Sequence, residues 1–216
     1  MSPQPARSAP QRIVIEGQYV RLEPVAVRHA EGIFAISAGE EAAARYRWLP
    51  TDPPRTLADV EDWIAAVEHG PDIYVAVIDQ QTGRVLGRQA WLRVRPEHGS
   101  VEIGGIYWGL PMARSRLATE AFYLFARHAF DDLGYRRFEW KCNDLNTPSK
   151  AAATRFGFTF EGIFRQDMIV KGESRDTAWF SILDHEWPAL RGHYKRWLSQ
   201  ENFDDAGQQK SRLVLR

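Results

Sequence analysis

The sequence contains a single cysteine, Cys142, and no long run of apolar residues. One cysteine excludes an intrachain disulfide, which is typical of proteins from a reducing cytoplasm. No segment reaches the roughly 18 consecutive apolar residues of a membrane-spanning helix, and the N-terminal MSPQPARSAPQ lacks the apolar core of a signal peptide. We therefore expect a cytoplasmic protein without a membrane partner.

The sequence also lacks an excess of charge of either sign, because 28 Lys and Arg residues balance 28 Asp and Glu residues. This balance gives no argument for nucleic acid as a partner, so any anion site has to be local. The six histidines form no H-E-x-x-H motif, and C-x-x-C, G-x-S-x-G and the P-loop Lys-Ser/Thr pair are absent. We therefore expect no metal centre.

The overall composition is typical of a globular protein, with 44% hydrophobic and 26% charged residues in a chain of 216. The Pro- and Ser-rich segment 1–12 predicts a flexible tail, and the polar segment 200–216 predicts a loosely held extension. No shift in composition divides 13–199, so we expect one domain there, in a monomer or a homodimer.

Hydrophobic periodicity and turn residues predict elements in the order β-α-α-β-β-β-α-β-α-β-β. The predicted strands are 18–25, the two arms of a hairpin over 72–94, 99–109, 135–143, 158–170 and 173–184. The predicted helices are 28–39, 56–70 with Thr56 as N-cap, 112–134, and 147–157 with Thr147 as N-cap, while 44–56 is an irregular connector. The long helix 112–134 has to lead into a parallel neighbouring strand. The fold class is therefore α/β (α+β), with a mixed, mostly antiparallel sheet and helices on both faces.

The stretch LPMARSRLATEA, at the start of that long helix, carries Arg114 and Arg116 in its predicted first turn. The positive end of the helix dipole disfavours cations there, whereas the unpaired N–H groups of the first turn attract anions. A phosphate bound there would offset the charge of both arginines. The alternative is that both side chains point outward and pair with nearby acids.

A carboxylate lies in the middle of a predicted strand at Glu102, within VEIGGIYW. Strand alternation places it on the face of Trp108. Burial beside aromatic residues is expected to raise its pKa, as a general base requires. The alternatives are a solvated position or a salt bridge.

Three motifs in order, ATEA after the arginine loop, N-x-x-S at Asn146–Ser149, and FGFTFEG at 156–162, make the chain resemble the GNAT N-acetyltransferases. It is most similar to the branch of RimJ and RimL, the ribosomal-protein acetyltransferases. The resemblance implies a sheet splayed between its fourth and fifth strands, with acetyl-CoA in the gap. The family's phosphate-binding signature, Q/R-x-x-G-x-G/A, falls on Ala113–Ala118, where Arg116 replaces the usual glycine and Ala113 replaces Gln or Arg.

The same resemblance implies the roles of individual residues. Glu102 matches a position where a catalytic glutamate often lies, and the resemblance places Ser149 near the CoA sulfur. Many relatives protonate the leaving thiolate with a tyrosine in the following helix, but here that stretch reads AAATRFGF, with Phe156 and no tyrosine. Ser149 or a water is therefore expected to serve. The alternative for Ser149 is a helix-stabilising serine, and for Asn146 a turn residue. The implied cofactor-binding residues are Tyr107, Trp108, Ala113, Arg114, Ser115, Arg116, Leu117, Ala118, Thr119, Asn146 and Ser149.

The acceptor is the least determined part of this interpretation. Tyr46, Trp48, Trp91 and Trp179 are candidates for an acceptor pocket, although aromatic residues at strand spacing are also typical of a core. The branch resemblance implies a protein N-terminus as acceptor. A small amine, such as an aminoglycoside, polyamine or amino acid, is the alternative, and a catalytically weak acyl-CoA-binding module is a third hypothesis.

Overall fold

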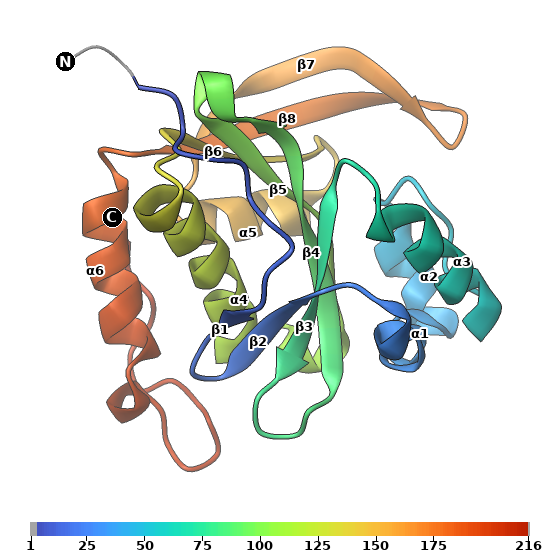
Figure 1. The fold of residues 1–216 in the computed structure, drawn as a ribbon, viewed down its shortest axis with the longest axis horizontal. Helices are drawn as coiled ribbons and strands as arrows, with labels where there is room; N and C mark the ends of the chain where they lie inside the picture. The colour runs from blue at the N-terminus through green and yellow to red at the C-terminus, as the bar shows by residue number, and fades with distance from the viewer. Residues whose placement is uncertain (1–3, 216) are drawn as a thin grey trace. The chain divides into compact units, whose positions relative to one another are not determined.

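A computed structural model describes residues 4–215 of the chain (Figure 1). We predicted one domain over 13–199, and the contacts between residues group the chain into two compact units. The first unit takes in the described residues up to Ala9, Arg95–Glu102, and those from Phe125 onward. The second unit consists of Pro10–Val94 and Ile103–Leu124.

The second unit holds strands hydrogen-bonded in the order β1-β2-β3-β4-β5. The pairs β1–β2, β2–β3 and β3–β4 are antiparallel, as the predicted hairpin over 72–94 requires. The strands are β1 (Ile15–Glu16), β2 (Val20–Pro24), β3 (Ile73–Asp79), β4 (Val85–Arg95) and β5 (Ser100–Trp108). The helices are α1 (Ala30–Ser37), α2 (Glu40–Tyr46), α3 (Leu57–Glu68) and α4 (Arg116–Arg127), the last of which continues into the first unit.

Helices α1 and α3 cover one face of this sheet. Ile33 of α1 and Ile64 of α3 are buried in one cluster with Ala76 and Ile78 of β3. Helix α3 begins where the sequence predicts, because the side chain of Thr56 accepts a hydrogen bond from the backbone of its third residue. The predicted N-cap is confirmed.

Helix α4 covers the opposite face. Its Ala121 carbonyl accepts a hydrogen bond from the Gln89 side chain of β4 at 3.0 Å. The buried carboxylate of Glu120 accepts the backbone N–H groups of Tyr19 at 2.6 Å and Val20 at 2.7 Å. Gly17 has no side chain to obstruct this contact, since a Cβ atom there would lie 2.8 Å from the carboxylate. Helices therefore cover both faces of the sheet in this unit, as predicted.

The first unit holds strands in the order β5-β6-β8-β7. The start of β5 pairs in parallel with β6 through three residue pairs, from Ser100 with Arg137 to Glu102 with Glu139. This confirms the predicted parallel neighbour after the long helix. The remaining pairs are antiparallel. The elements are β6 (Arg137–Asn143), α5 (Thr147–Arg155), β7 (Thr159–Val170), β8 (Glu173–Leu183) and α6 (Trp187–Leu198).

Three helices differ from the prediction. Helix α4 begins at Arg116 rather than 112, because a 3₁₀ turn over Leu110–Met112 precedes it. Helix α2 occupies part of the predicted connector 44–56, and α6 follows the last element that we predicted.

Both chain ends make hydrogen bonds in the described structure, although we predicted a flexible tail and a loose extension. Near the N-terminus, the backbone N–H of Arg7 donates to Leu133 O at 2.8 Å. Near the C-terminus, Trp197 Nε1 donates to Ser211 O at 3.0 Å. These bonds hold the segments against packed helices. Residues 1–3 and 216, the outermost part of both predictions, lie outside the described residues.

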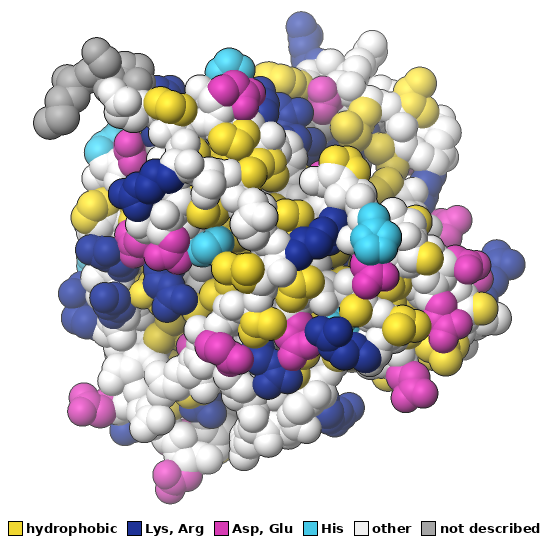
Figure 2. All heavy atoms as spheres, in the orientation of Figure 1, with side chains coloured by type: hydrophobic (Ala, Val, Ile, Leu, Met, Phe, Trp, Pro, Cys, Tyr) yellow, Lys and Arg dark blue, Asp and Glu magenta, His cyan; other side chains and the backbone are white. Residues whose placement is uncertain are grey.

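The distribution of surface charge and the length of the helices are relevant to possible nucleic-acid and membrane partners. On the face drawn in Figure 2, basic and acidic side chains are interspersed, in keeping with their equal numbers. Within the described residues, no helix has the length and apolar character that crossing a membrane requires.

Candidate active site

The loop between β5 and α4 in the second unit is a compact turn. Met112 N donates to Gly109 O, and Ala113 N donates to Leu110 O, both at 3.0 Å. The Ser115 hydroxyl donates back to Met112 O at 2.8 Å. These bonds close the loop immediately before the first residue of α4.

The two arginines of this loop differ in their surroundings. Arg114 is exposed and has a left-handed backbone with φ of 58°, and it precedes the helix rather than lying in its first turn as predicted. Arg116 opens the helix, and its guanidinium carbon lies 4.3 Å from the ring centroid of Tyr19. The contact has the geometry of a cation–π interaction. Arg116 is therefore held in part by an aromatic ring, whereas Arg114 faces solvent.

The first turn of α4 presents backbone donors. The N–H groups of Arg116, Leu117 and Ala118 have no partner within the helix, as in every α-helix, and they carry the positive end of the helix dipole. The hydroxyl of buried Thr119 turns back to Ser115 O at 3.4 Å. This arrangement suits an anion, because the donors and an exposed guanidinium lie at one helix end.

The end of β5 is anchored within the second unit. The Tyr107 hydroxyl donates to Ile36 O at 3.0 Å, and burial raises the pKa of Tyr107. The Trp108 indole donates to Gln89 Oε1 at 3.1 Å, and its carbonyl accepts a hydrogen bond from Arg45. Upstream, Gly105 has a left-handed φ of 57°. The regular alternation of side chains along β5, from which we predicted that Glu102 and Trp108 share one face, is therefore interrupted in mid-strand.

A cavity of about 400 Å³ opens in the second unit between α1, α3 and the segment that follows α2. Tyr46 lines it, as predicted for the acceptor pocket. Trp91 is a core residue, 1% exposed, and Trp48 is covered by the guanidinium of Arg47 at 4.8 Å. The residues that line the cavity are Ile33, Ser37, Tyr46, Thr51, Asp52, Pro53, Pro54, Arg55, Asp59, Val60, Trp63 and Arg88.

In the first unit, Glu102 is buried, with 1% of its surface exposed. Lys141 Nζ lies 3.3 Å from its Oε2 atom, so the carboxylate has the salt-bridge partner that we named as an alternative. The same ammonium lies 5.3 Å from the ring centroid of Trp179. The buried Trp179 packs against Phe164 at 5.3 Å, which places this acceptor candidate among side chains of the first unit.

Helix α5 begins at Asn146, which is the N-cap in place of the predicted Thr147. Its Oδ1 atom accepts the backbone N–H of Ser149 at 3.1 Å. The Ser149 hydroxyl accepts the indole N–H of Trp140 at 3.0 Å. Burial raises the pKa of the neighbouring Cys142 thiol, and a hydrogen bond from Ser149 acts in the opposite direction. The hydroxyl is thus oriented by one donor and has a sulfur atom as a neighbour.

The comparisons with known proteins agree with these elements. A family model described as an acetyltransferase (GNAT) domain matches residues 20–159, well over half of the chain. The chain belongs to the GNAT acetyltransferase family. This confirms the family recognised from ATEA, Asn146–Ser149 and FGFTFEG, and with it the predicted fold class.

This acetyltransferase is similar to a GCN5-related N-acetyltransferase from Brucella melitensis, with which it shares 52% sequence identity. The crystal structure of that protein matches with a TM-score of 0.94, and the match covers 97% of this chain and 96% of that one. It is 29% identical over 116 residues to the uncharacterized N-acetyltransferase p20 of Bacillus licheniformis, covering 52% of this chain and only 62% of p20. The crystal structure of RimL, the ribosomal L7/L12 alpha-N-protein acetyltransferase, shares the fold at 17% identity, with a TM-score of 0.69 over 79% of this chain and 94% of that one.

One residue that lines the cavity of this acetyltransferase, Arg88, is not among the sites predicted from the sequence. Arg88 lies on β4 and is 5% exposed, with its guanidinium carbon 4.5 Å from the ring centroid of Trp63. The signal was present, because a charged residue in the middle of an apolar strand requires a partner. The sequence predicts Trp63 only as part of the apolar face of the helix over 56–70. Among the described residues, no group of three or more His, Cys, Asp or Glu side chains has an arrangement able to hold a metal ion.

Proposed function

We propose that this acetyltransferase transfers an acetyl group from acetyl-CoA to a primary amine, by direct attack in a ternary complex. The observation that carries the proposal is the start of α4, where N–H groups and the exposed Arg114 lie at one helix end within the family domain. Bound there, acetyl-CoA supplies an activated acetyl thioester. The amine nitrogen attacks the carbonyl carbon, the carbon–sulfur bond breaks, the nitrogen loses a proton and the sulfur gains one.

The fit to the phosphates of acetyl-CoA rests on charge and donor geometry. Arg114 provides guanidinium donors, which bind phosphate strongly. The guanidinium of Arg116 adds further donors when it moves away from the ring of Tyr19. The N–H groups of Arg116, Leu117 and Ala118 provide the backbone donors. The substitution of Arg116 for the family's glycine removes a close backbone approach and adds a cation.

We propose Glu102 as the group that removes the proton from the attacking amine, directly or through water. Its support is burial together with the ammonium of Lys141, which lies 3.3 Å from Oε2. A general base must be ionised to accept the proton, and an adjacent ammonium favours that form, in opposition to burial, which raises the pKa of a carboxyl group. The backbone at Tyr107 and Trp108 is our candidate for polarising the thioester carbonyl.

We propose Ser149 as the proton donor to the leaving thiolate. Trp140 occupies one acceptor position of its hydroxyl, and the hydroxyl proton is shared with the Cys142 sulfur. To act as the donor, the hydroxyl has to turn that proton from Cys142 to the leaving thiolate. Asn146 fixes the backbone of Ser149, so we propose that it supports this geometry in addition to any contact with the cofactor. Phe156, where a tyrosine would compete for the role, carries no proton to donate.

A protein N-terminus, a small-molecule amine and a weakly catalytic binding module make different experimental predictions. An acetyl-CoA binder gains about 3–4 kcal/mol of stability at a hundred- to thousandfold excess over its dissociation constant. We therefore expect a raised unfolding temperature with acetyl-CoA, and thiol release when an acceptor from a panel of amines and N-terminal peptides is added. Stabilisation without thiol release from any acceptor would favour the binding module, and no stabilisation would refute the proposal.

A further inference from the structure

We infer that the cavity of the second unit binds the amine acceptor and that this acceptor is a small amine bearing a carboxylate, held by Arg88. The inference rests on the proposed function, because it names the substrate class of the transfer. It selects among the acceptors that the sequence left open.

Arg88 is a buried cation without a carboxylate partner in the described part of the chain. Its guanidinium carbon lies 4.5 Å from the ring centroid of Trp63 and 5.7 Å from that of Tyr74, and its Nη1 atom donates to Gly105 O at 2.9 Å. None of the acidic side chains that the structure describes forms an ion pair with it. A buried charge without a counter-ion is unfavourable, so the site is completed by an anion.

The backbone around Gly105 creates this arrangement. With φ of 57° and no side chain, the glycine lets β5 approach Tyr74, where a Cβ atom would lie 2.7 Å from the ring. Its carbonyl thereby reaches one guanidinium nitrogen of Arg88. An arginine has five N–H donors, so most of the fork remains for a ligand carboxylate, which it can bind through two hydrogen bonds.

Four charged residues line the cavity, the acids Asp52 and Asp59 and the bases Arg55 and Arg88. Arg88 is buried, whereas the other three are exposed, so the buried charge of the cavity is positive. At the rim, the Asp59 carboxylate is occupied in capping α3, accepting the backbone N–H groups of Arg55 at 2.7 Å and Thr56 at 2.8 Å. A polycation such as an aminoglycoside or polyamine would meet the like charge of Arg88 inside the cavity.

The walls and the volume of the cavity indicate the chemical character of the rest of the acceptor, beyond its carboxylate. Ile33, Val60 and Tyr46 are buried, and Trp63 stands edge-on to Tyr74 with ring centroids 5.2 Å apart. A cavity of about 400 Å³ with such walls accommodates a small ligand with an apolar or aromatic body. These features favour an α-amino acid with a large apolar side chain over the N-terminus of a protein.

The test is a binding comparison between acids and their amides. Isothermal titration of the full chain with L-phenylalanine, L-tryptophan and L-leucine, each beside its carboxamide, measures the contribution of the carboxylate without acetyl-CoA. We expect at least one acid to bind about tenfold more tightly than its amide, the effect of a hydrogen-bonded charge pair. Equal affinities, or no binding of any of these acids, would overturn the inference.

Two variants attribute the preference to Arg88. Arg88→Gln should reduce the acid-to-amide ratio to within about twofold, and Arg88→Lys should retain only part of it, because an ammonium lacks the planar fork. Arg84→Gln, at an exposed position just before β4, is the matched control and should keep the full ratio. Since Arg88 is buried, each variant is first shown to be folded by circular dichroism, and the lysine variant keeps the test decisive if the glutamine variant unfolds.

Failure of this inference is distinguishable from failure of the proposed function. Stabilisation by acetyl-CoA and thiol release with an amidated or peptide acceptor, but no binding of free amino acids, would leave acetyl transfer standing and refute the carboxylate site. Binding of a free amino acid without any effect of acetyl-CoA would support the site and refute the transfer reaction.

Discussion

The indole nitrogen of Trp140 donates a hydrogen bond to the hydroxyl oxygen of Ser149 at 3.0 Å. The bond joins β6 to the first turn of α5 within the first unit, and Asn146 fixes the Ser149 backbone from the other side. The Asn146 bond is the cap of the helix, whereas the Trp140 bond orients the Ser149 hydroxyl itself. The relationship therefore provides a direct test of the proposed proton donor.

Ser149→Ala should lower kcat by about 10²-fold, because general acid catalysis typically contributes 10²–10⁴ in rate. The KM for acetyl-CoA should change little. Trp140→Phe should give a smaller loss, since the hydroxyl remains but loses its orienting donor. Steady-state thiol release measures both, with Thr154→Ala as control, because its exposed hydroxyl lies on the same helix and donates to Lys150 O within that helix. An unchanged kcat in Ser149→Ala would remove it from the mechanism.

Arg114→Ala should weaken acetyl-CoA binding more than Arg116→Ala does. The exposed Arg114 loses a full phosphate donor, whereas Arg116 is partly committed to the ring of Tyr19. We expect a loss of about 3–10-fold in affinity for the first variant, with a weaker dependence on salt, because one screened charge contact is gone. Titration at several ionic strengths checks this. Arg127→Ala, at the far end of the same helix, is the control.

If neither arginine variant alters the affinity or its salt dependence, the phosphates are not bound at this helix end. If Arg116→Ala has the larger effect, its guanidinium must leave Tyr19 on binding, and the missing glycine is then compensated by the arginine side chain itself.

Elements with strong local signals could be predicted from the sequence. Thr56 was recognisable as a helix start because an N-cap residue followed by an apolar helical pattern is a local signal. The hairpin turn at Lys171–Gly172 was recognisable in the same way, and both residues have the positive φ that such a turn requires.

Features that depend on distant contacts could not be predicted. Arg88 and Gln89 are adjacent polar residues in a strand covered on both faces, and their partners come from α3, β5 and α4. The start of α4 was predicted four residues early because Arg114 has a left-handed backbone, which a residue with a bulky side chain rarely adopts. The cap of α5 was assigned one residue too late because Asn146 and Thr147 are both good N-caps.

Glu102→Gln and Lys141→Met separate catalysis from ion pairing. If Glu102 is the general base, Glu102→Gln should lower kcat/KM by about 10²-fold or more while keeping the shape of the side chain. Lys141→Met should mainly destabilise the fold, because it leaves a buried carboxylate without its ammonium. Urea unfolding and thiol release are measured on both. A Glu102→Gln enzyme with full activity would show that the pair is structural.

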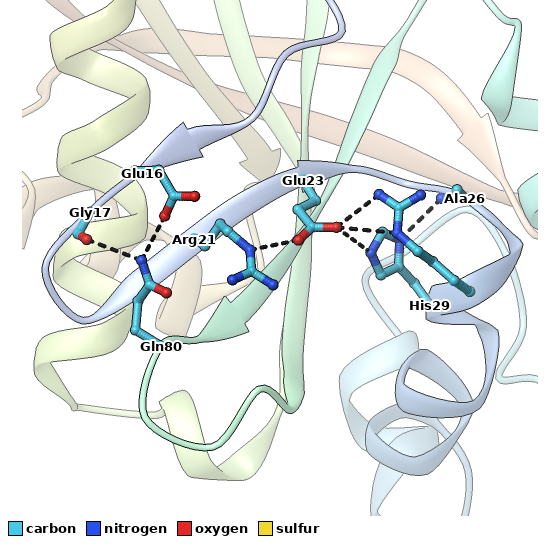
Figure 3. A network of polar contacts seen from close by, with 8 residues as sticks. Glu16, Gly17, Arg21, Glu23, Ala26, His29 and Gln80 are labelled. Atoms are coloured by element: carbon cyan, nitrogen blue, oxygen red, sulfur yellow. Dashed lines mark hydrogen bonds and ion pairs between the residues drawn. The ribbon is translucent and has the colours of Figure 1, made fainter.

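A charge network around Glu23 makes stability dependent on pH (Figure 3). Its carboxylate accepts hydrogen bonds from Arg21 Nε at 2.5 Å and Arg28 Nη2 at 2.8 Å, and His29 Nε2 lies 3.1 Å away. The backbone N–H of Ala26 donates to His29 Nδ1 at 3.1 Å, so His29 is neutral with its proton on Nε2, toward Glu23. Burial raises the pKa of Glu23, but the hydrogen bonds from Arg28, His29 and Arg21 together lower it to about 2.

The network should weaken the fold in acid in two stages. Burial lowers the pKa of His29 below 6.5, so its stabilising neutral form is lost first as the pH falls below that value. The contribution of Glu23 is complete above its ordinary value of 4.5 and is lost as the pH falls toward 2. Urea unfolding at pH 7, 5 and 3 should show Glu23→Gln less stable by about 1.5–3 kcal/mol at pH 7, with the difference shrinking at pH 3. Glu16→Gln, on neighbouring β1, is the control, and an equal difference at all three pH values would contradict the assignment.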